Sequence, residues 1–298
     1  MEANRILNSL IKGTVGPVMI LITIIMMVWY AGAVYLNSSF LIDRYEKNNI
    51  DWSFSELATD SWSMERPVLP SPHQVAKELK KSIWDKKITS KRSLVFHSGV
   101  TLSSAMLGFV MGTFLGILLS VGIVYVPALD RTLMPWIIAS QTIPILAIAP
   151  MIIVVLGSMG IVGLFPKATI STYLCFFPVV VGMVKGLRSP NIILVDLMHS
   201  YSASKTQVFW KLRMPASIPY LFASMKIAVA LSIVGSIVAE LPAGAQAGLG
   251  ARLLSGSYYG QTNLIWAALI TASVISATLV SVIGRMERSV NNRMGLQT

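Results

Sequence analysis

Few side chains in this sequence could do covalent chemistry, and they are not spaced as a catalytic set. The histidines, His73, His97 and His199, lie in separate segments, and none belongs to an H-E-x-x-H zinc motif. Cys175 is the only cysteine, which excludes an intrachain disulfide and a metal site built from paired thiols. The sequence also lacks a G-x-x-x-x-G-K-[ST] phosphate loop. It therefore predicts no catalytic residue, no metal site and no cofactor in this chain.

Polar residues inside apolar stretches point to transport instead. Pro135, Pro144 and Pro150 interrupt one such stretch, and Gln141 and Thr142 precede the middle proline. Proline frees a backbone carbonyl, which within a membrane must be satisfied by protein or by a watery cavity. This pattern favours a translocation path along Gln141, Thr142 and Pro144. Equally, Gln141 could simply bond a neighbouring helix.

Glu240 is a second polar candidate for this path. It follows a long apolar stretch and directly precedes Leu241 and Pro242. Two interpretations stay open: the carboxylate shapes an outer gate, or it is a solvated group at a helix end.

The 185–217 segment has the composition of a docking surface. It is rich in Lys and Arg, and its apolar residues recur at helical spacing. Ser204 is a candidate N-cap for a short second helix, and Pro215 is expected to stop that helix. A helix-turn-helix that exposes Tyr201, Phe209 and Trp210 would be suited to docking another protein. The alternative is an interfacial helix that rests on lipid headgroups.

The elements that carry these residues are predicted to span a membrane. Hydrophobic residues make up 54% of the chain and charged residues only 12%, against about 25% in soluble domains. A helix needs roughly 20 apolar residues to cross the hydrocarbon core. We therefore expect an all-α integral membrane protein with about six transmembrane helices. Their approximate ranges are 15–36, 94–123, 135–156, 167–184, 218–240 and 263–284.

Charge in the short loops predicts the orientation. The formal net charge of +11 is explained by Lys and Arg kept in cytoplasmic loops, so we expect lipid and not nucleic acid as the contact. The 185–217 loop, the C-terminal tail and the N-terminus with Arg5 and Lys12 fall on one side, predicted to be the cytoplasm. The basic residues of 77–92 then fall on the opposite, periplasmic side, in a long loop where the rule weakens.

The chain divides at about residue 92. Residues 1–92 are predicted to form an N-terminal anchor helix and a periplasmic polar segment, in which Val75, Leu79 and Ile83 favour a helix lying on the membrane. Residues 93–298 are predicted to form the transmembrane domain. There Ser104, Gly108, Gly112 and Gly116 are four apart, and this stripe predicts close helix packing.

The loop sequence resembles the cytoplasmic signature of ABC importer permeases, E-A-A, three residues, G, nine residues, I-x-L-P. Asp196, Leu197 and Met198 occupy the E-A-A places, and Ser202 occupies the glycine place. Leu212 and Pro215 begin and end the I-x-L-P part. Asp196 keeps the carboxylate of the signature. Ser202 departs from it, which puts the geometry of the turn in question.

Further matches extend the resemblance over about residues 65–290. They are Leu69-Pro-Ser-Pro72, the run from Ile143 to Pro150, Pro219-Tyr-Leu-Phe222 and Val238-Ala-Glu240. These are similar to the branch that serves nitrate, sulfonate, taurine and pyrimidine importers.

The resemblance implies a permease subunit in the bacterial inner membrane. It implies that the 185–217 loop is a cytoplasmic coupling loop, which carries a coupling helix and is bound by ABC ATPase subunits that hold the ATP. Further implied partners are a periplasmic solute-binding protein and a second permease copy, identical or similar. The solute is expected to be a pyrimidine-type vitamin precursor or related heterocycle, or else taurine, a sulfonate or nitrate. The alternative is an ion-coupled secondary transporter, which the scarcity of ionisable residues within the spans disfavours.

Overall fold

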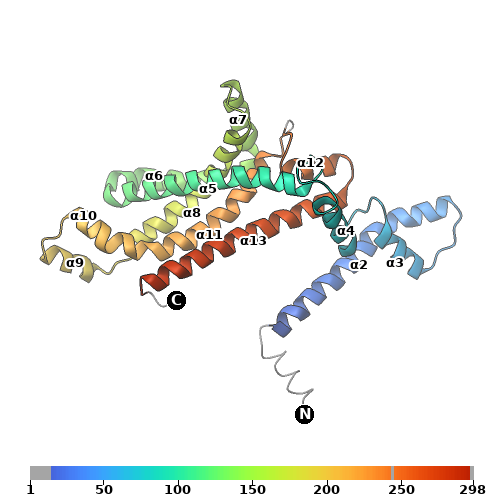
Figure 1. Cartoon of the computed structure of the whole chain (residues 1–298), viewed down its shortest axis with the longest axis horizontal. Helices are drawn as coiled ribbons and strands as arrows, with labels where there is room; N and C mark the ends of the chain where they lie inside the picture. Colours follow the sequence, from blue (N-terminus) through green and yellow to red (C-terminus); the bar gives the residue numbers. More distant parts are fainter. Residues whose placement is uncertain (1–14, 243–244, 296–298) are drawn as a thin grey trace, which may run out of the picture. The chain divides into compact units, whose positions relative to one another are not determined.

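The computed structural model describes residues 15–242 and 245–295, and every regular element in this part of the chain is helical. The predicted cytoplasmic residues Arg5 and Lys12 lie outside the described residues. The elements are α2 (Val15–Lys47), α3 (Phe54–Ser63), α4 (Pro72–Ile83), α5 (Leu94–Tyr125), α6 (Pro127–Ser140), α7 (Ile145–Ser158), α8 (Leu164–Leu187), α9 (Ile192–Ser200), α10 (Lys205–Val208), a π-helical segment (Phe209–Arg213), α11 (Met214–Ala239), α12 (Leu249–Tyr258) and α13 (Thr262–Arg293) (Figure 1).

Five of the described helices are long and apolar enough to cross a membrane, and the bent pair α6–α7 makes up to six. The all-α membrane architecture is therefore confirmed. The chain separates into two compact units. One holds the chain up to Ile88 together with Leu253–Leu269, and the other holds Thr89–Arg252 and the chain from Ile270 onward.

In the first unit, α2 is longer than the predicted helix at 15–36. It continues to Lys47 because its last turns pack on α3, where Leu41 and Tyr45 bury themselves against Leu57. Asn37 is fully buried, and its amide donates to the carbonyls of Ser61 and Leu69 at 3.1 and 3.0 Å. The polar segment after α2 is thus folded back onto the helix.

Local signals in the same segment explain how α3 and α4 begin. Ser53 and Glu56 form a capping box at the start of α3. The hydrogen bond from the Ser53 backbone, and then that from its hydroxyl, hold the pKa of Glu56 below its usual value. The helix predicted around Val75 is present as α4. Val75 is only 1% exposed and packs against protein, whereas Leu79 and Ile83 on the same face are half-buried.

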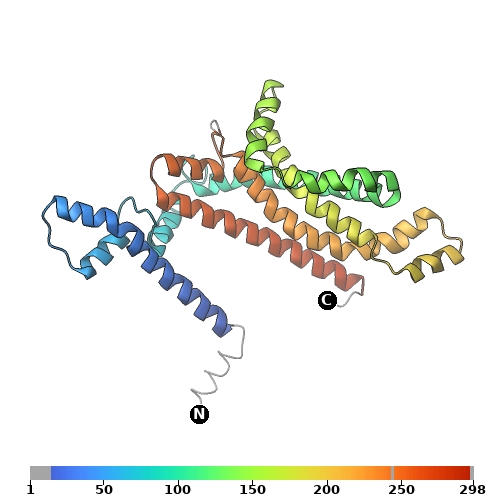
Figure 2. The ribbon, with the colours of Figure 1, turned by 180° about the vertical axis from the view of Figure 1, so that it is seen from behind.

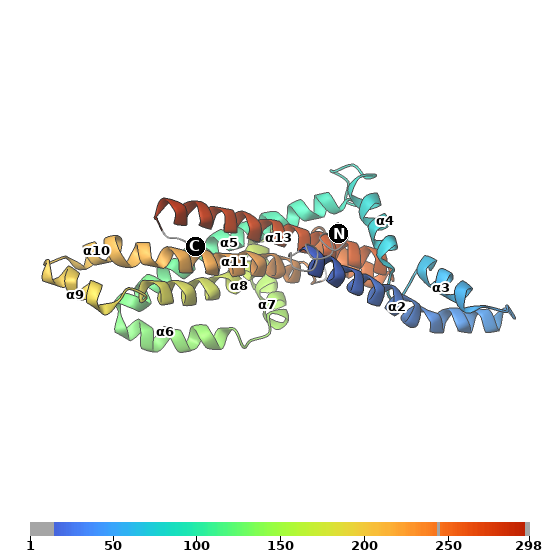
Figure 3. The ribbon, with the colours of Figure 1, turned by 90° about the horizontal axis from the view of Figure 1, so that it is seen from below.

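The second unit is built on α5, α8 and α11, which lie side by side in Figures 1 and 3. The stripe predicted on the second span faces α8. A Cβ added to Gly108, Gly112 or Gly116 would lie 2.3, 2.7 or 2.7 Å from the Cβ of Ser171, Cys175 or Val179. Ser104, the first residue of the stripe, is buried and donates to the hydroxyl of Ser236 on α11 at 3.1 Å.

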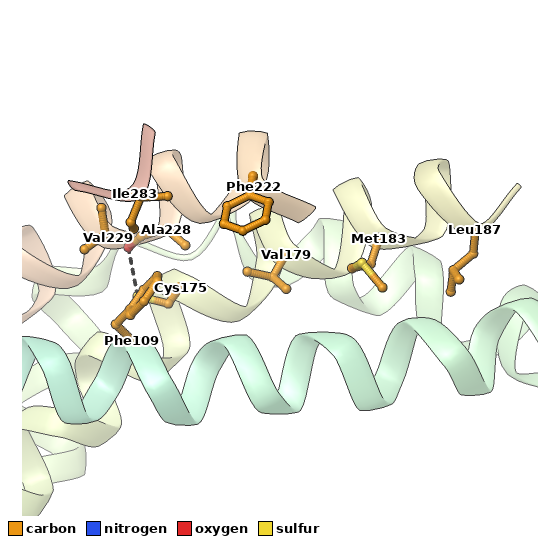
Figure 4. Packing of buried hydrophobic residues seen from close by; sticks show 9 residues of the cluster. All are labelled: Phe109, Cys175, Val179, Met183, Leu187, Phe222, Ala228, Val229 and Ile283. Carbon is orange, nitrogen blue, oxygen red and sulfur yellow. Dashed lines mark hydrogen bonds between the residues drawn. The ribbon is translucent and has the colours of Figure 1, made fainter. Parts of the chain in front are cut away.

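The buried apolar residues of this unit fill the seam between the same helices (Figure 4). Cys175, Val179 and Met183 on α8 pack toward Phe222 and Ala228 on α11, and the Cys175 thiol donates to the Ala228 carbonyl at 3.1 Å. Packing and hydrogen bonds drive helix association where lipid removes the hydrophobic driving force. The core of this unit is therefore the α8 seam.

Alanine substitutions on α5 test this seam. Gly112→Ala places a methyl group against Cys175 and should lower stability by about 1–3 kcal/mol, as overpacking does. Gly99→Ala on the same helix meets nothing within 4 Å, so the higher helix propensity of alanine should raise stability, by up to about 1 kcal/mol.

The measurement is thermal unfolding of the two purified variants in detergent. A Gly112→Ala protein as stable as the Gly99→Ala protein would show that α5 and α8 are not in backbone contact.

Candidate functional site

The candidate docking loop sits at one end of the second unit, between α8 and α11 (Figures 1 and 2). Its base is tied to the bundle by two arginines. Arg188 bonds Asp130, at the start of α6, at 2.8 Å, and Arg213 donates to the Leu187 carbonyl at 3.3 Å. We call this end of the unit the loop end.

Helix α9 begins at a local cap and presents its side chains to the surroundings. Asn191 accepts from the backbone N–H of Ile193 at 3.0 Å, as an N-cap does. None of the α9 residues is buried: Ile192 is 68% exposed, Leu197 is 50% exposed, and the Asp196 carboxylate is exposed as well. Met198, the third residue of the E-A-A place, is half-buried. A short helix with large apolar residues and one acid is therefore presented at the loop end.

The turn after α9 keeps the geometry that the family signature assigns to glycine. Ser202 has a φ of +53°, in the left-handed region. The N–H of Ser202 donates to the His199 carbonyl at 2.8 Å, and that of Ala203 donates to the Met198 carbonyl at 3.0 Å. These two bonds are the Schellman pattern of a helix C-terminus. Serine thus makes the tight turn and bears the cost of a left-handed conformation.

The chain then enters α11 without the expected stop. Ser204 and Gln207 form a capping box at the start of α10, as the sequence predicts for Ser204. The prediction that Pro215 ends this helix is wrong, because the helix continues through the π-helical segment into α11. Pro215 lies in the first turn of α11, directly after the widened π turn closed by the Met214 N–H to the Phe209 carbonyl.

The aromatic residues of the loop divide into two groups. Tyr201 is 80% exposed and Trp210 is 62% exposed. Phe209 is half-buried, and its ring packs edge-on against Tyr125 at 5.8 Å, so the expectation that it is exposed is wrong. Leu212 is half-buried as well. Phe209 anchors the loop to α5, while Tyr201 and Trp210 belong to the free surface.

The polar candidates around Pro144 lie at a complete break in the helix. The sequence predicts one kinked span at 135–156, but α6 and α7 are separate helices at an angle of 101° (Figures 1 and 2). Gln141 caps the end of α6, Thr142 lies in the break, and Pro144 precedes α7. The Tyr173 hydroxyl on α8 donates to the Ser140 carbonyl, which fixes the break beside the bundle.

Glu240 lies at the end of the unit opposite the loop, and it is not a solvated carboxylate. It is fully buried. Its oxygens accept from the Thr101 hydroxyl at 2.8 and 3.1 Å, from the Gly250 N–H at 3.0 Å and from the Lys167 ammonium at 3.4 Å. The structure thus places Glu240 inside its own chain. Sequence reasoning missed Lys167 and Thr101, which lie far from Glu240 along the chain and stand in no recognisable motif with it.

A third ion pair joins two of the long helices. Lys226 on α11 pairs with Glu287 on α13. The charge of Lys226, which lies inside the predicted span 218–240, is thus compensated by protein.

Comparison with known proteins gives consistent matches. Residues 106–296 match the family described as binding-protein-dependent transport system inner membrane component. The formylaminopyrimidine transport permease protein ThiX of Halalkalibacterium halodurans is 33% identical, over 61% of this chain and 68% of the relative. The riboflavin transport system permease protein RibX of Chloroflexus aurantiacus is 31% identical, over 74% and 78%.

More distant matches agree in kind. The taurine transport system permease protein TauC of Escherichia coli is 25% identical, over 71% of this chain and 74% of the relative. A solved structure of the MetNI methionine ABC transporter in inward-facing conformations has the same fold, with a TM-score of 0.54 and 21% identity. That match covers 64% of this chain and 91% of the other.

The turn at Ser202 is open to a direct test with a pair of glycine substitutions. Ser202→Gly removes the left-handed strain and should stabilise the turn by about 1 kcal/mol. Ser200→Gly, two residues earlier in α9, should destabilise the helix by a similar amount. Rates of tryptic cleavage after Lys205 should therefore change about fivefold in opposite directions. Faster cleavage of both variants would contradict the left-handed assignment of Ser202.

Proposed function

We propose that this chain, which belongs to the family of binding-protein-dependent transport system inner membrane components, is driven by a separate ATPase that binds its 185–217 loop. Membership of this family makes the chain the permease subunit of an ABC-type importer. The resemblance to the branch that serves taurine and pyrimidine importers is confirmed by the formylaminopyrimidine and taurine permeases among the relatives.

The observation that carries the proposal is the surface of α9. Large apolar side chains that remain exposed at the end of a rigid helical hairpin are costly in water and favour a protein partner. Leu197 and Tyr201 supply such side chains, and Asp196 directly precedes Leu197 in the chain. An ATPase groove with apolar walls and a cation would complement this set. The capped ends of α9 support the proposal, because a helix already formed pays little ordering entropy on binding.

The anchoring of the loop supports its role in transmitting force. Phe209 packs on Tyr125 of α5, and Arg213 donates to the last carbonyl of α8. A displacement of the loop by the ATPase is therefore passed to α5, α8 and α11. In this proposal ATP binding closes the ATPase pair and the helices respond by alternating access.

The broken pair α6–α7 is proposed to line the solute path. Irregular backbone at membrane depth is tolerated only where protein or a watery cavity covers it. Gln141, Thr142 and Pro144 lie at such a break, beside Tyr173 on α8. Transporters commonly place their sites at discontinuous helices. Glu240 is not included in this lining, because its carboxylate is enclosed by the chain.

Orientation and partners complete the proposal. The loop end and both termini of the chain are assigned to the cytoplasm of a bacterial cell, and the 37–92 segment is assigned to the periplasm. A second permease copy and a periplasmic solute-binding protein complete the importer. The solute is proposed to be a small heterocycle of the pyrimidine-precursor type, in line with the formylaminopyrimidine and riboflavin permeases among the relatives. Taurine or a sulfonate is the alternative, in line with the taurine permease.

Charge reversal at Asp196 tests the docking proposal. Asp196→Lys replaces an acceptor with a cation in a loop already rich in Lys and Arg, and losing a buried charged contact commonly costs about 2–5 kcal/mol. The variant should insert normally but lose its ATPase during purification and lose ATP-driven uptake. Asp51→Lys is the matched control, since Asp51 is exposed and assigned to the opposite side of the membrane. Equal retention of the ATPase by both variants would refute docking through α9.

A further inference from the structure

A continuous polar cluster closes the end of the second unit opposite the loop. It centres on Glu240, at the end of α11, which is fully buried. The carboxylate receives hydrogen bonds from Thr101 on α5, from Lys167 on α8 and from the backbone of Gly250 in the first turn of α12. Four helices are thus joined at one side chain. We call Glu240, Lys167, Thr101 and Gly250 the Glu240 clamp.

The clamp holds the start of α12 more firmly than the carboxylate alone would. The Thr101 hydroxyl, which donates to Glu240, also accepts from the Leu249 N–H at 2.8 Å. His97, one turn earlier on α5, accepts from the Gly248 N–H at 2.9 Å through Nδ1. The Lys167 ammonium also donates to the Ala247 carbonyl at 2.9 Å. Each of residues 247–250 is therefore hydrogen-bonded to the bundle: residue 247 to α8, residues 248 and 249 to α5, and residue 250 to Glu240 at the end of α11.

The two glycines of this segment are required by the carboxylate. Gly248 has a φ of +128°, and a Cβ there would lie 2.0 Å from the Glu240 carboxyl carbon. A Cβ at Gly250 would lie 2.3 Å from the Ile237 carbonyl oxygen and 2.7 Å from the Glu240 Cβ. The backbone wraps the carboxylate at a distance that no other residue permits. A solvent-facing charge would need no such fit.

Two of the helices that meet at the clamp, α8 and α11, also meet at the loop. Helix α8 ends at the loop and α11 begins there, and at 1.5 Å per residue they run about 36 and 39 Å to the opposite end. They are in backbone contact near both ends. A Cβ at Gly186 would lie 2.9 Å from Ser217, and one at Gly235 would lie 2.8 Å from the Cα of Ser171. Helices packed this closely cannot slide independently, because protein interiors are close-packed and transmit strain.

We propose that Glu240 is a positioning residue of the transport cycle, which passes movements of α8 and α11 to the 245–250 segment at the outer end. The clamp fixes the first turn of α12 to the bundle, so a displacement that begins at the loop reaches that turn without loss. This inference rests on the proposed function, in which the loop binds the ATPase. It adds a movement of the 245–250 segment at the opposite end of the same helices.

The test measures how nucleotide changes the accessibility of the 245–250 segment to a thiol reagent. Gln246 is exposed, so Gln246→Cys provides a label site, whereas the native Cys175 is fully buried. The full chain with its ATPase in nanodiscs is treated with an impermeant maleimide, without nucleotide and after trapping with ATP and vanadate. The labelling rate should change by roughly 5- to 150-fold, the usual range for coupling between distant sites.

Two variants remove the clamp in different ways. Glu240→Gln has nearly the same shape but loses the charge that Lys167 pairs with, and Gly248→Ala keeps both charges but displaces the carboxylate. Each should reduce the nucleotide-dependent change to less than about twofold, while the ATPase stays bound. Gly160→Ala is the matched control. Gly160 also has a positive φ, +78°, but a Cβ there meets nothing within 4 Å, so this variant should keep the full change.

The outcomes separate this inference from the proposed function. A full nucleotide-dependent change in Glu240→Gln and Gly248→Ala would reduce the clamp to a structural contact and overturn the inference. An ATPase that binds and hydrolyses ATP without any effect at position 246 would overturn it too, with the docking proposal intact. Failure of the unsubstituted chain to bind an ATPase would overturn the proposed function itself. Gly248→Ala alone decides the case if Glu240→Gln does not assemble.

Discussion

The close approach of α8 to both α5 and α11 is the constraint on which the rest of the second unit depends. Gly108, Gly112 and Gly116 admit α8 on one side, and Gly235 admits it on the other. In lipid, van der Waals contact at this range is the main attraction between helices. Because the three helices are held together along their length, the position of the loop at one end and that of the Glu240 clamp at the other are set by the same packing.

Two carboxylates at the ends of this bundle are used in opposite ways. Glu240 is fully buried and is compensated by Lys167, Thr101 and a backbone N–H. Such a group adds little net stability, but removing its partner is costly, which makes it suited to fixing one geometry. Asp196 is exposed on α9 and is free to meet a partner. In the proposed transport cycle the buried acid serves the internal transmission of movement, and the exposed acid serves recognition.

The features that depend on local sequence pattern could be predicted. The apolar stretches gave the helices, the four-residue spacing gave the stripe on α5, and Ser204 gave the cap of α10. Sequence reasoning failed where the answer lies in distant partners or in backbone geometry. The burial of Glu240 depends on Thr101 and Lys167, 139 and 73 residues away. The left-handed turn at Ser202 is held by the two Schellman hydrogen bonds, and the helix continues through Pro215 because this proline lies in the first turn of α11, directly after the π turn.

Amide hydrogen exchange along α9 tests the central claim most directly, namely that this short capped helix is the surface through which an ATPase drives the bundle. The permease in nanodiscs would be compared with and without its ATPase. The account predicts that the amides of residues 192–200 slow by at least about tenfold in the complex, as expected for a segment buried in a tight interface, while those of α3 are unchanged. Unchanged exchange in α9, with slowing elsewhere on the chain, would contradict it.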